Sequence, residues 1–122
     1  MVQKMKIKKP VIDTILGLCQ EAYPREIGGI LLGKRIVDDF VLVPGQFSMH
    51  SIYIRLYDIP IYTNAAGTFH SHPAPQPKPS GADLDFFRRV PGKHLIVTVP
   101  YDLNSVHVYD SKGKAQKIEV VE

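Results

Sequence analysis

The sequence contains a single cysteine, Cys19, and no tryptophan. One cysteine cannot form a disulfide within the chain, so a small secreted scaffold held together by disulfides is excluded. No long apolar run follows the basic segment at residues 1–10, so neither a signal peptide nor a membrane-spanning segment is expected. These absences favour a cytoplasmic protein that does not enter a membrane.

The chain also lacks low-complexity tracts, and its formal net charge is only +3. It has no Gly-rich phosphate loop, no aromatic residues interleaved with the basic ones and no helix-turn-helix pattern, so no nucleic-acid partner is expected. Lysines gather near both ends of the chain, where exposure to solvent accounts for them. The 122 residues suffice for one domain with a hydrophobic core, but they are too few for two domains that each bury a core of their own. We therefore expect a single domain over residues 1–122.

Hydrophobic periodicity predicts two helices. Apolar residues recur at helical spacing over residues 10–23, and Pro10 fits the first turn of that helix. Cys19 lies on this apolar stripe, which favours a small buried hydrophobic side chain over a nucleophile. A second helix is predicted over residues 80–90 and ends before Pro91.

The remaining apolar segments have the composition of strands. Two apolar runs within residues 28–45 flank a polar turn at Asp38 and Asp39, which predicts a hairpin. Further strands are expected at residues 51–57, 67–70, 94–99, 104–109 and 115–121. The result is a sheet with two helices.

The segment HSHPAPQPKPSGAD, residues 70–83, is the most unusual stretch of the chain. On a strand, residues i and i+2 point to the same face, so His70 and His72 direct both imidazoles to one spot while Ser71 points away. Two convergent imidazoles supply half of a zinc site. The prolines that follow resist helix formation and predict a stiff, extended loop.

Ser80 and Asp83 fall in the first turn of the second predicted helix. The Asp83 carboxylate can face back toward His70 and His72, which gives a set of two histidines and one aspartate with an open fourth position, as in catalytic zinc sites. Each pair alone has a simpler explanation, because S-x-x-D is an ordinary helix start and H-x-H is common on surfaces. The two roles are compatible, since a helix cap can hold the aspartate where a metal needs it.

The chain resembles the JAB1/MPN metalloproteases at the five residues of their JAMM motif, here Glu26, His70, His72, Ser80 and Asp83. The prolines and glycines that flank these residues match as well, and the resemblance runs from the first predicted helix to the last strand. It implies an α/β fold of the MPN type, related to the cytidine deaminases, in which a curved mixed β-sheet is flanked by two main helices. In size and layout the chain is most similar to the small stand-alone archaeal members.

The resemblance also implies a mechanism. His70, His72 and Asp83 would bind one zinc ion per chain, with a water molecule in the fourth place. Glu26 would accept a proton from that water and deliver it to the leaving amine, and Ser80 would hydrogen-bond the oxyanion or the water. The bond implied for cleavage is the isopeptide between a lysine and the C-terminal glycine of a ubiquitin-like modifier.

The implied partners are ubiquitin-like or sulfur-carrier proteins with a Gly-Gly tail, and their lysine-linked conjugates. The chain lacks the insertion that larger deubiquitinases carry after the motif, which speaks against specificity for one ubiquitin linkage. Two alternatives stay open: a non-catalytic MPN scaffold or interaction module, and a zinc hydrolase of small peptides. The paired-cysteine zinc site of the cytidine deaminases is excluded by the single cysteine. A homodimer also stays open.

Some candidate residues lie outside these matches. Glu21 and Asp85 compete with Glu26 as the base, but Glu21 falls in the first predicted helix and Asp85 departs from the spacing of the motif. We expect His107 to face solvent and His94, at the start of a strand, to have no special role.

The segment SIYIRLYDIP, residues 51–60, is either an interior strand or an exposed sheet edge. At an edge, it could pair with the extended tail of a modifier. The resemblance favours the edge role, and it places His50 beside the cleft.

Overall fold

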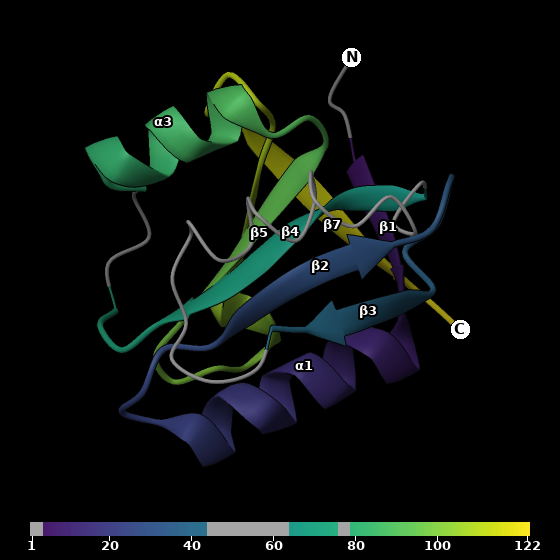
Figure 1. Ribbon diagram of the computed structural model, residues 1–122. Helices are drawn as coiled ribbons and strands as arrows, with labels where there is room; N and C mark the ends of the chain where they lie inside the picture. Colours follow the sequence, from purple (N-terminus) through teal and green to yellow (C-terminus); the bar gives the residue numbers. More distant parts are fainter. Residues whose placement is uncertain (1–3, 44–63, 76–78) are drawn as a thin grey trace.

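The computed structural model describes residues 4–43, 64–75 and 79–122, which form one curled sheet with a helix on each face (Figure 1). The strand order is β1-β7-β6-β5-β4-β2-β3. The strands are β1 (Lys4–Lys8), β2 (Gly28–Leu32), β3 (Asp39–Leu42), β4 (Ala65–His72), β5 (Lys93–Thr98), β6 (Val106–Tyr109) and β7 (Ala115–Val121). The helices are α1 (Lys9–Ala22), α3 (Gly81–Arg89) and a short 3-10 turn, Leu103–Ser105.

Parallel and antiparallel pairs are mixed in this sheet. The strands β1 and β7 run parallel, as do β4 and β5, whereas the other neighbours are antiparallel. The sheet curls until β1 meets the segment between β2 and β3, where Lys8 and Val37 share a backbone hydrogen bond of 2.9 Å. The curved mixed sheet implied by the family resemblance is confirmed.

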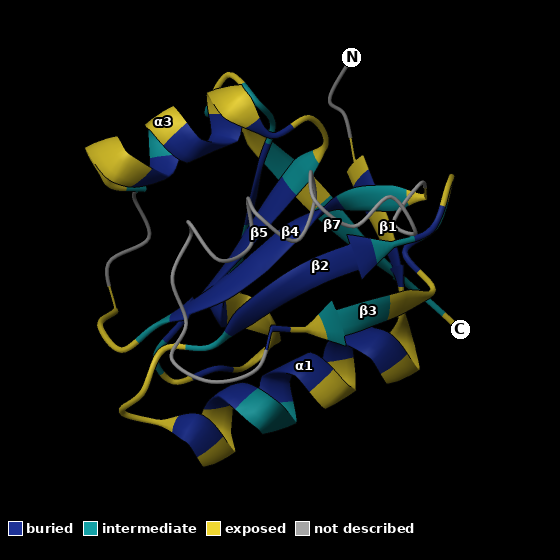
Figure 2. Cartoon of the chain, viewed as in Figure 1, coloured by how far each residue is buried: buried dark blue, intermediate teal, exposed yellow. Residues whose placement is uncertain are grey.

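Helix α1 forms because its apolar residues recur on one side, and that side packs on the sheet (Figure 2). Its buried side chains join those of β2, β4 and β5, among them Leu31, Phe69 and Leu95. Cys19 is fully buried in this cluster, and burial raises the pKa of its thiol to about 12. The expectation of a small buried side chain at Cys19 is therefore confirmed.

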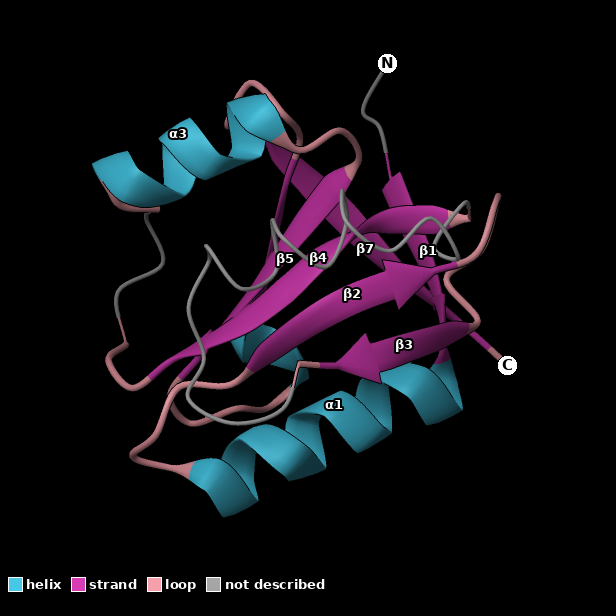
Figure 3. Ribbon diagram, viewed as in Figure 1, coloured by secondary structure: helices cyan, strands magenta, loops and turns pink. Residues whose placement is uncertain are grey.

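Helix α3 covers the opposite face (Figure 3). It begins at Ser80, whose side chain and the side chain of Asp83 form a reciprocal capping box. Phe86 and Phe87 are buried against Ile30 and other residues of the sheet. Because strand residues alternate, Phe69 faces α1 whereas its neighbours on β4 lie on the α3 face.

Strand β1 was not predicted. Its lysines alternate with Met5 and Ile7, which are buried, so the basic segment is half core and half surface. The expected exposure of the lysines is confirmed. The strand is stabilised by parallel pairing with β7, which lies more than a hundred residues away in the chain. A pairing over that distance cannot be predicted from the local sequence pattern.

Several boundaries also differ from the sequence-based expectation, and β4, Ala65–His72, extends the strand predicted at residues 67–70 at both ends. The predicted turn at Asp38 and Asp39 lies earlier, at residues 33–38, because Gly33 leaves β2 with a φ of +136° and Asp39 is already the first residue of β3. Asn104 lies in the 3-10 turn rather than in β6. The strand predicted at residues 51–57 and His50 lie outside the described residues. In the described part of the chain, no helix is long and apolar enough to span a membrane.

Candidate metal centre

The end of β4 places two histidines on the α3 face. Strand β4 is held between β2 and β5, so its backbone is fixed on both sides. His70 is buried and His72 is half-buried, and their Nε2 atoms lie 3.1 Å apart. The convergence expected from the i, i+2 spacing is therefore present.

The first turn of α3 brings a carboxylate to the same point. Asp83 is buried, and its Oδ1 lies 3.3 Å from His70 Nε2 while its Oδ2 lies 3.7 Å from His72 Nε2. The backbone N–H of Ser80 donates to Oδ2 at 2.8 Å, and the N–H of Asp83 donates to Ser80 Oγ at 3.1 Å. The helix cap thus orients the carboxylate toward the histidines.

These three side chains form a group that could hold a metal ion. Zinc binds nitrogen and oxygen ligands at about 2.0–2.1 Å, and tetrahedral geometry then separates two ligand atoms by roughly 3.3 Å. The observed separations of 3.1, 3.3 and 3.7 Å bracket that value. Two imidazoles and one carboxylate are also a ligand set that zinc accepts. The residues present therefore fit the ion.

The electrostatics of the group favour a cation. Burial by itself raises the pKa of Asp83, but hydrogen bonds from His70 and from the backbone N–H of Ser80 outweigh it and lower the pKa to about 2. The pKa of His72 is lowered by burial and by His70, against the opposing attraction of Asp83 and Glu26. Near neutral pH the carboxylate is ionised and the His72 imidazole is neutral, as metal ligands must be.

Glu26 lies beside this group. Strands β2 and β4 pair Gly28 with His70, and the next pair outward is Ile27 with Ser71. The Ser71 N–H donates to the Ile27 carbonyl at 2.9 Å, and the Ile27 N–H donates to Ser71 Oγ at 2.9 Å. Strand β2 begins at Gly28, two residues after Glu26, and the charge of Glu26 acts on the pKa of His72 at the end of β4. Glu26 is exposed, so its carboxylate is open to solvent.

The competing carboxylates lie elsewhere. Asp85 is on the exposed side of α3, where Arg88 and Arg89 approach its carboxylate at 3.6 and 3.3 Å. Glu21 lies on the exposed side of α1. Neither belongs to the group of possible metal ligands found in the described residues. Ser80 is exposed at the edge of that group.

His94 has a structural role that the sequence analysis missed. It is fully buried between β4, β5 and α3, and its ring stacks on Phe87 with centroids 4.6 Å apart. Its Nε2–H donates to the Val90 carbonyl at 2.8 Å, which leaves Nδ1 to accept from the Thr68 hydroxyl at 2.7 Å. His94 therefore ties the end of α3 to the strand that carries the histidines.

His107 also differs from the expectation. It is half-buried rather than facing solvent, and its Nε2 lies 3.3 Å from Thr98 Oγ1. Burial lowers its pKa. Neither His94 nor His107 stands near a second metal-binding side chain in the sequence. The hydrogen-bond partners of these two histidines could therefore be expected only from their burial.

The comparisons with known proteins agree with this geometry. Residues 8–109 match the family described as prokaryotic homologues of the JAB domain. A probable metalloprotease of Haloferax volcanii is 30% identical over 130 residues, which cover 95% of this chain and 79% of the relative.

Solved structures give the same result. A JAB1/MPN domain protein from Archaeoglobus fulgidus is 36% identical, with a TM-score of 0.78 over 97% of this chain and 100% of that one. A structure described as JAMM, a metalloprotease-like zinc site in the proteasome and signalosome, is 35% identical, with a TM-score of 0.77 over 98% of this chain and 100% of that one. The chain is thus a small JAB1/MPN/JAMM protein, a member of the prokaryotic branch of the JAB-domain family.

Proposed function

We propose that the protein is a zinc-dependent isopeptidase that cleaves after the C-terminal glycine of a ubiquitin-like or sulfur-carrier modifier. The observation that carries this proposal is the convergence of His70, His72 and Asp83 at the separations of a tetrahedral site, with Glu26 beside them. The similarity to a probable metalloprotease supports hydrolysis of a peptide-type bond.

In this proposal His70 and His72 would hold the ion through their Nε2 atoms and Asp83 would hold it through Oδ1, while Asp83 Oδ2 accepts the Ser80 N–H. Zinc, when bound there, supplies a Lewis acid that makes water nucleophilic near neutral pH. The Ser80 N–H keeps the carboxylate from rotating away, because rotation would break its hydrogen bond to Oδ2, and the Asp83 N–H fixes Ser80 in turn by donating to its Oγ.

Glu26 moves the proton in two stages. Its carboxylate accepts a proton as water attacks the carbonyl carbon, and it gives that proton to the leaving lysine amine when the C–N bond breaks. The products are a free glycine carboxylate and a free amine. An exposed position suits this role, since the residue must meet a substrate that arrives from solvent.

Ser80 stabilises the charge that develops on the carbonyl oxygen. Its Oγ already accepts the Asp83 N–H, so its own O–H remains to donate. A donor preset by the helix cap needs little reorganisation during the reaction. Reception of the tail by residues 51–60 stays a prediction, because that segment lies outside the described residues.

The test is Glu26→Gln, with Glu21→Gln as the matched control on α1. We expect Glu26→Gln to lower turnover of a Gly-Gly-tailed modifier, fused or lysine-linked, by at least about 100-fold while bound zinc is unchanged. The control should keep both turnover and zinc. Turnover and zinc content are measured on the same preparations.

Three results would contradict the proposal in different ways. Retained turnover in Glu26→Gln would place the base elsewhere. Hydrolysis of short peptides without cleavage of any tailed modifier would favour the small-peptide hydrolase. A purified protein that binds no zinc would favour the non-catalytic scaffold.

A further inference from the structure

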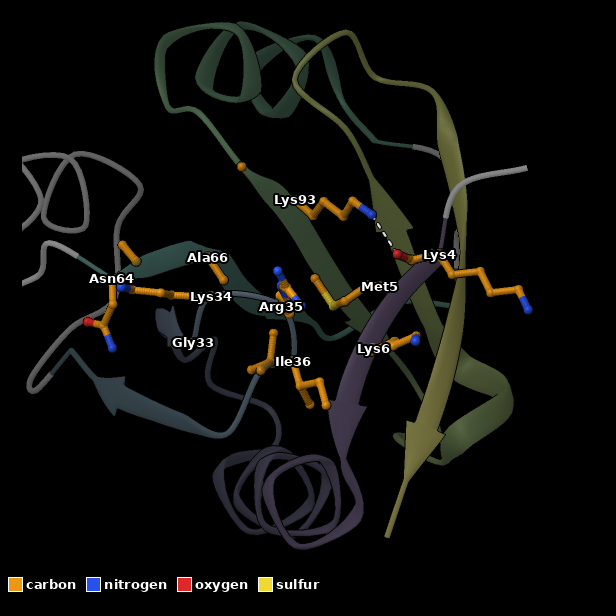
Figure 4. Close-up of a pocket in the computed structure, with 13 residues that line it drawn as sticks. Lys4, Met5, Lys6, Gly33, Lys34, Arg35, Ile36, Asn64, Ala66 and Lys93 are labelled. Atoms are coloured by element: carbon orange, nitrogen blue, oxygen red, sulfur yellow. Dashed lines mark hydrogen bonds between the residues drawn. The ribbon is translucent and has the colours of Figure 1, made fainter. Parts of the chain in front are cut away.

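A cavity lies far from the metal centre, where the curled sheet nearly closes. It has a volume of about 450 Å³ and is bordered by residues 4–6 of β1 and by the β2–β3 connection, residues 33–37 (Figure 4). Its remaining walls are residues 64–66, at the start of β4, and residues 92–93, at the start of β5. We call this cavity the closure pocket.

The closure pocket and the metal centre occupy opposite ends of β4. Ala66 borders the pocket and His72 belongs to the metal centre. The six residue steps between them span roughly 20 Å along a strand. A small molecule bound in the pocket therefore does not reach the metal ligands.

The lining of the closure pocket is strongly basic. Its charged residues are Lys4, Lys6, Lys34, Arg35 and Lys93, and no aspartate or glutamate is found among the described residues that line it. Lys4 turns away from the pocket, since its ammonium lies 3.4 Å from Glu119 on β7 (Figure 4). Lys6 lies on the same face of β1 as Lys4, so Lys34, Arg35 and Lys93 remain as the cations beside the cavity.

One of these cations is held in place. The Lys93 ammonium donates to the backbone carbonyl of Lys4 at 2.6 Å, which fixes its position on the wall between β5 and β1. This bond uses one of its three N–H donors and leaves two for a ligand. Arg35, on the opposite wall, is exposed and offers a planar guanidinium that can bind an oxyanion with two parallel hydrogen bonds.

Apolar side chains lie between the cations. Met5, Ile36 and Ala66 stand between the basic residues in Figure 4, and Met5 and Val37 are buried. The volume falls in the range of cavities that bind small molecules. A ligand that fits therefore combines anionic groups with a body that has an apolar face.

Ordinary surface lysines are a simpler explanation for basic side chains, and they account for Lys8 and Lys117, which stand on exposed parts of β1 and β7. The closure pocket differs because its cations border a concavity, and no aspartate or glutamate stands among the described residues that line it. Like charges gathered in this way repel one another and raise the local positive potential, and a bound polyanion relieves that repulsion.

We propose that the closure pocket binds a small phosphorylated molecule that carries at least two negative charges, of the size class of a nucleoside diphosphate. Arg35 binds one phosphate with its guanidinium, Lys34 and Lys93 neutralise the rest, and the apolar side chains receive the body of the ligand. This site does not depend on the activity proposed for the metal centre.

The test is a titration of the zinc-loaded, ¹⁵N-labelled full chain with ADP, pyrophosphate and inorganic phosphate, at about 0.1 M salt. We expect saturable amide shifts at Gly33 and Gly92, which border the pocket, and none at Ser71 or Asp83 in the metal centre. ADP should bind more tightly than inorganic phosphate, because it adds charge and an apolar body. Zinc content is checked at the end of each titration.

Two charge-matched double variants complete the test. Lys34→Gln with Arg35→Gln removes two cations from the pocket, and we expect it to weaken ADP binding at least about 10-fold. Lys8→Gln with Lys117→Gln removes the same charge from outside the pocket, and we expect a change of less than about 2-fold. All four side chains are exposed, so the fold should tolerate both variants.

Several outcomes would overturn the proposal. One is the absence of saturable shifts up to about 1 mM of each probe. Another is equal weakening by the two double variants, which would indicate attraction by net charge alone. Shifts confined to Ser71 and Asp83 would place the anion at the metal, and tighter binding of a glutamate-rich peptide would indicate a protein partner instead.

Discussion

The two faces of the sheet are built from different chemistry. Toward α1, the strands present apolar side chains such as Leu31, Phe69 and Leu95, which pack as one cluster with the helix. Toward α3, buried polar residues share the layer with aromatic rings, and they include His70, His94 and Asp83. Burying polar groups is unfavourable unless each finds a partner, so the α3 face needs specific hydrogen bonds where the α1 face needs only packing.

The α1 face therefore mainly stabilises the fold, whereas the α3 face carries the candidate metal ligands. The α1 face can supply most of the hydrophobic stabilisation because none of the candidate metal ligands lies on it. The α3 face can hold ionisable groups because packing on the α1 face already fixes the strands that carry them. The comparison makes distinct predictions for the two faces. A substitution on one face should change the metal centre, and a substitution on the other should change the free energy of unfolding.

The largest effect is expected from a paired experiment with Asp83→Asn and Ile15→Ala. Asp83→Asn keeps the size of the side chain but removes the charge whose pKa is about 2. We expect zinc affinity to fall at least about 100-fold, with turnover lost, because a neutral amide is a poor zinc ligand. Isothermal titration with zinc and a turnover assay measure these changes.

Ile15→Ala is the counterpart on the α1 face. Ile15 is fully buried, so its truncation leaves a cavity and should lower the free energy of unfolding by about 2–5 kcal/mol. At a temperature well below the unfolding midpoint, bound zinc should stay unchanged. Loss of zinc from folded Ile15→Ala, or full zinc binding by Asp83→Asn, would show that the two faces are not separate in this way.

A smaller effect is expected from the pH dependence of stability. Burial lowers the pKa of His94 to about 4, from an ordinary value of 6.5. A lowered histidine pKa means that the folded state favours the neutral ring, so this stabilisation is complete above pH 6.5 and is lost as the pH falls toward 4. Between pH 7 and pH 5 the loss from this one group is about 2 kcal/mol.

Denaturant unfolding of metal-free protein at these two pH values measures the effect. His94→Gln removes the titrating ring, so its stability should fall by about 2 kcal/mol less than that of the unaltered protein over the same interval. Asp110 and His70 influence His94 electrostatically and are present in both proteins. Equal pH dependence in the two proteins would contradict a neutral, buried His94.

The hydrogen-bond partners of His94 could not be predicted from the sequence, whereas the metal group could. The metal group was predictable because its geometry is local: two histidines separated by one residue on a strand, and an aspartate in the first turn of a helix. The partners of His94 come from β4 and from the end of α3, and no spacing within β5 points to either. Only its position in a strand of apolar residues signalled that a buried polar group would need partners.

Glu26 and β1 show the same limit at longer range. The pairing of β2 with β4 brings the segment that carries Glu26 toward the histidines, and it depends on contacts between residues 33 to 44 positions apart in the chain. The family resemblance identified Glu26, whereas spacing did not. Strand β1 has only Met5 and Ile7 as buried residues, so its pairing with β7 follows from the curl of the whole sheet rather than from its own pattern.

The smallest effect is expected at Ser71, the residue between the two histidines. Its side chain points away from the metal centre, as the strand alternation predicted, but its Oγ accepts the Ile27 N–H and so holds the segment that carries Glu26. Ser71→Ala removes that acceptor and leaves a half-buried N–H unpaired, which should cost about 1 kcal/mol of stability. The resulting freedom of Glu26 should lower kcat about 10-fold, while bound zinc and KM stay near their original values.

Ser105→Ala is the matched control for this last prediction. Ser105 is also buried, and its hydroxyl donates to Asp102 at 2.8 Å in the 3-10 turn rather than holding the segment that carries Glu26. It should lose similar stability but keep kcat. A parallel fall of kcat in both variants would mean that general loosening of the fold explains the loss. A fall confined to Ser71→Ala would show that Ser71, on the α1 face of β4, positions the proposed base Glu26 through one hydrogen bond. The face that packs on α1 would then also contribute to the proposed reaction.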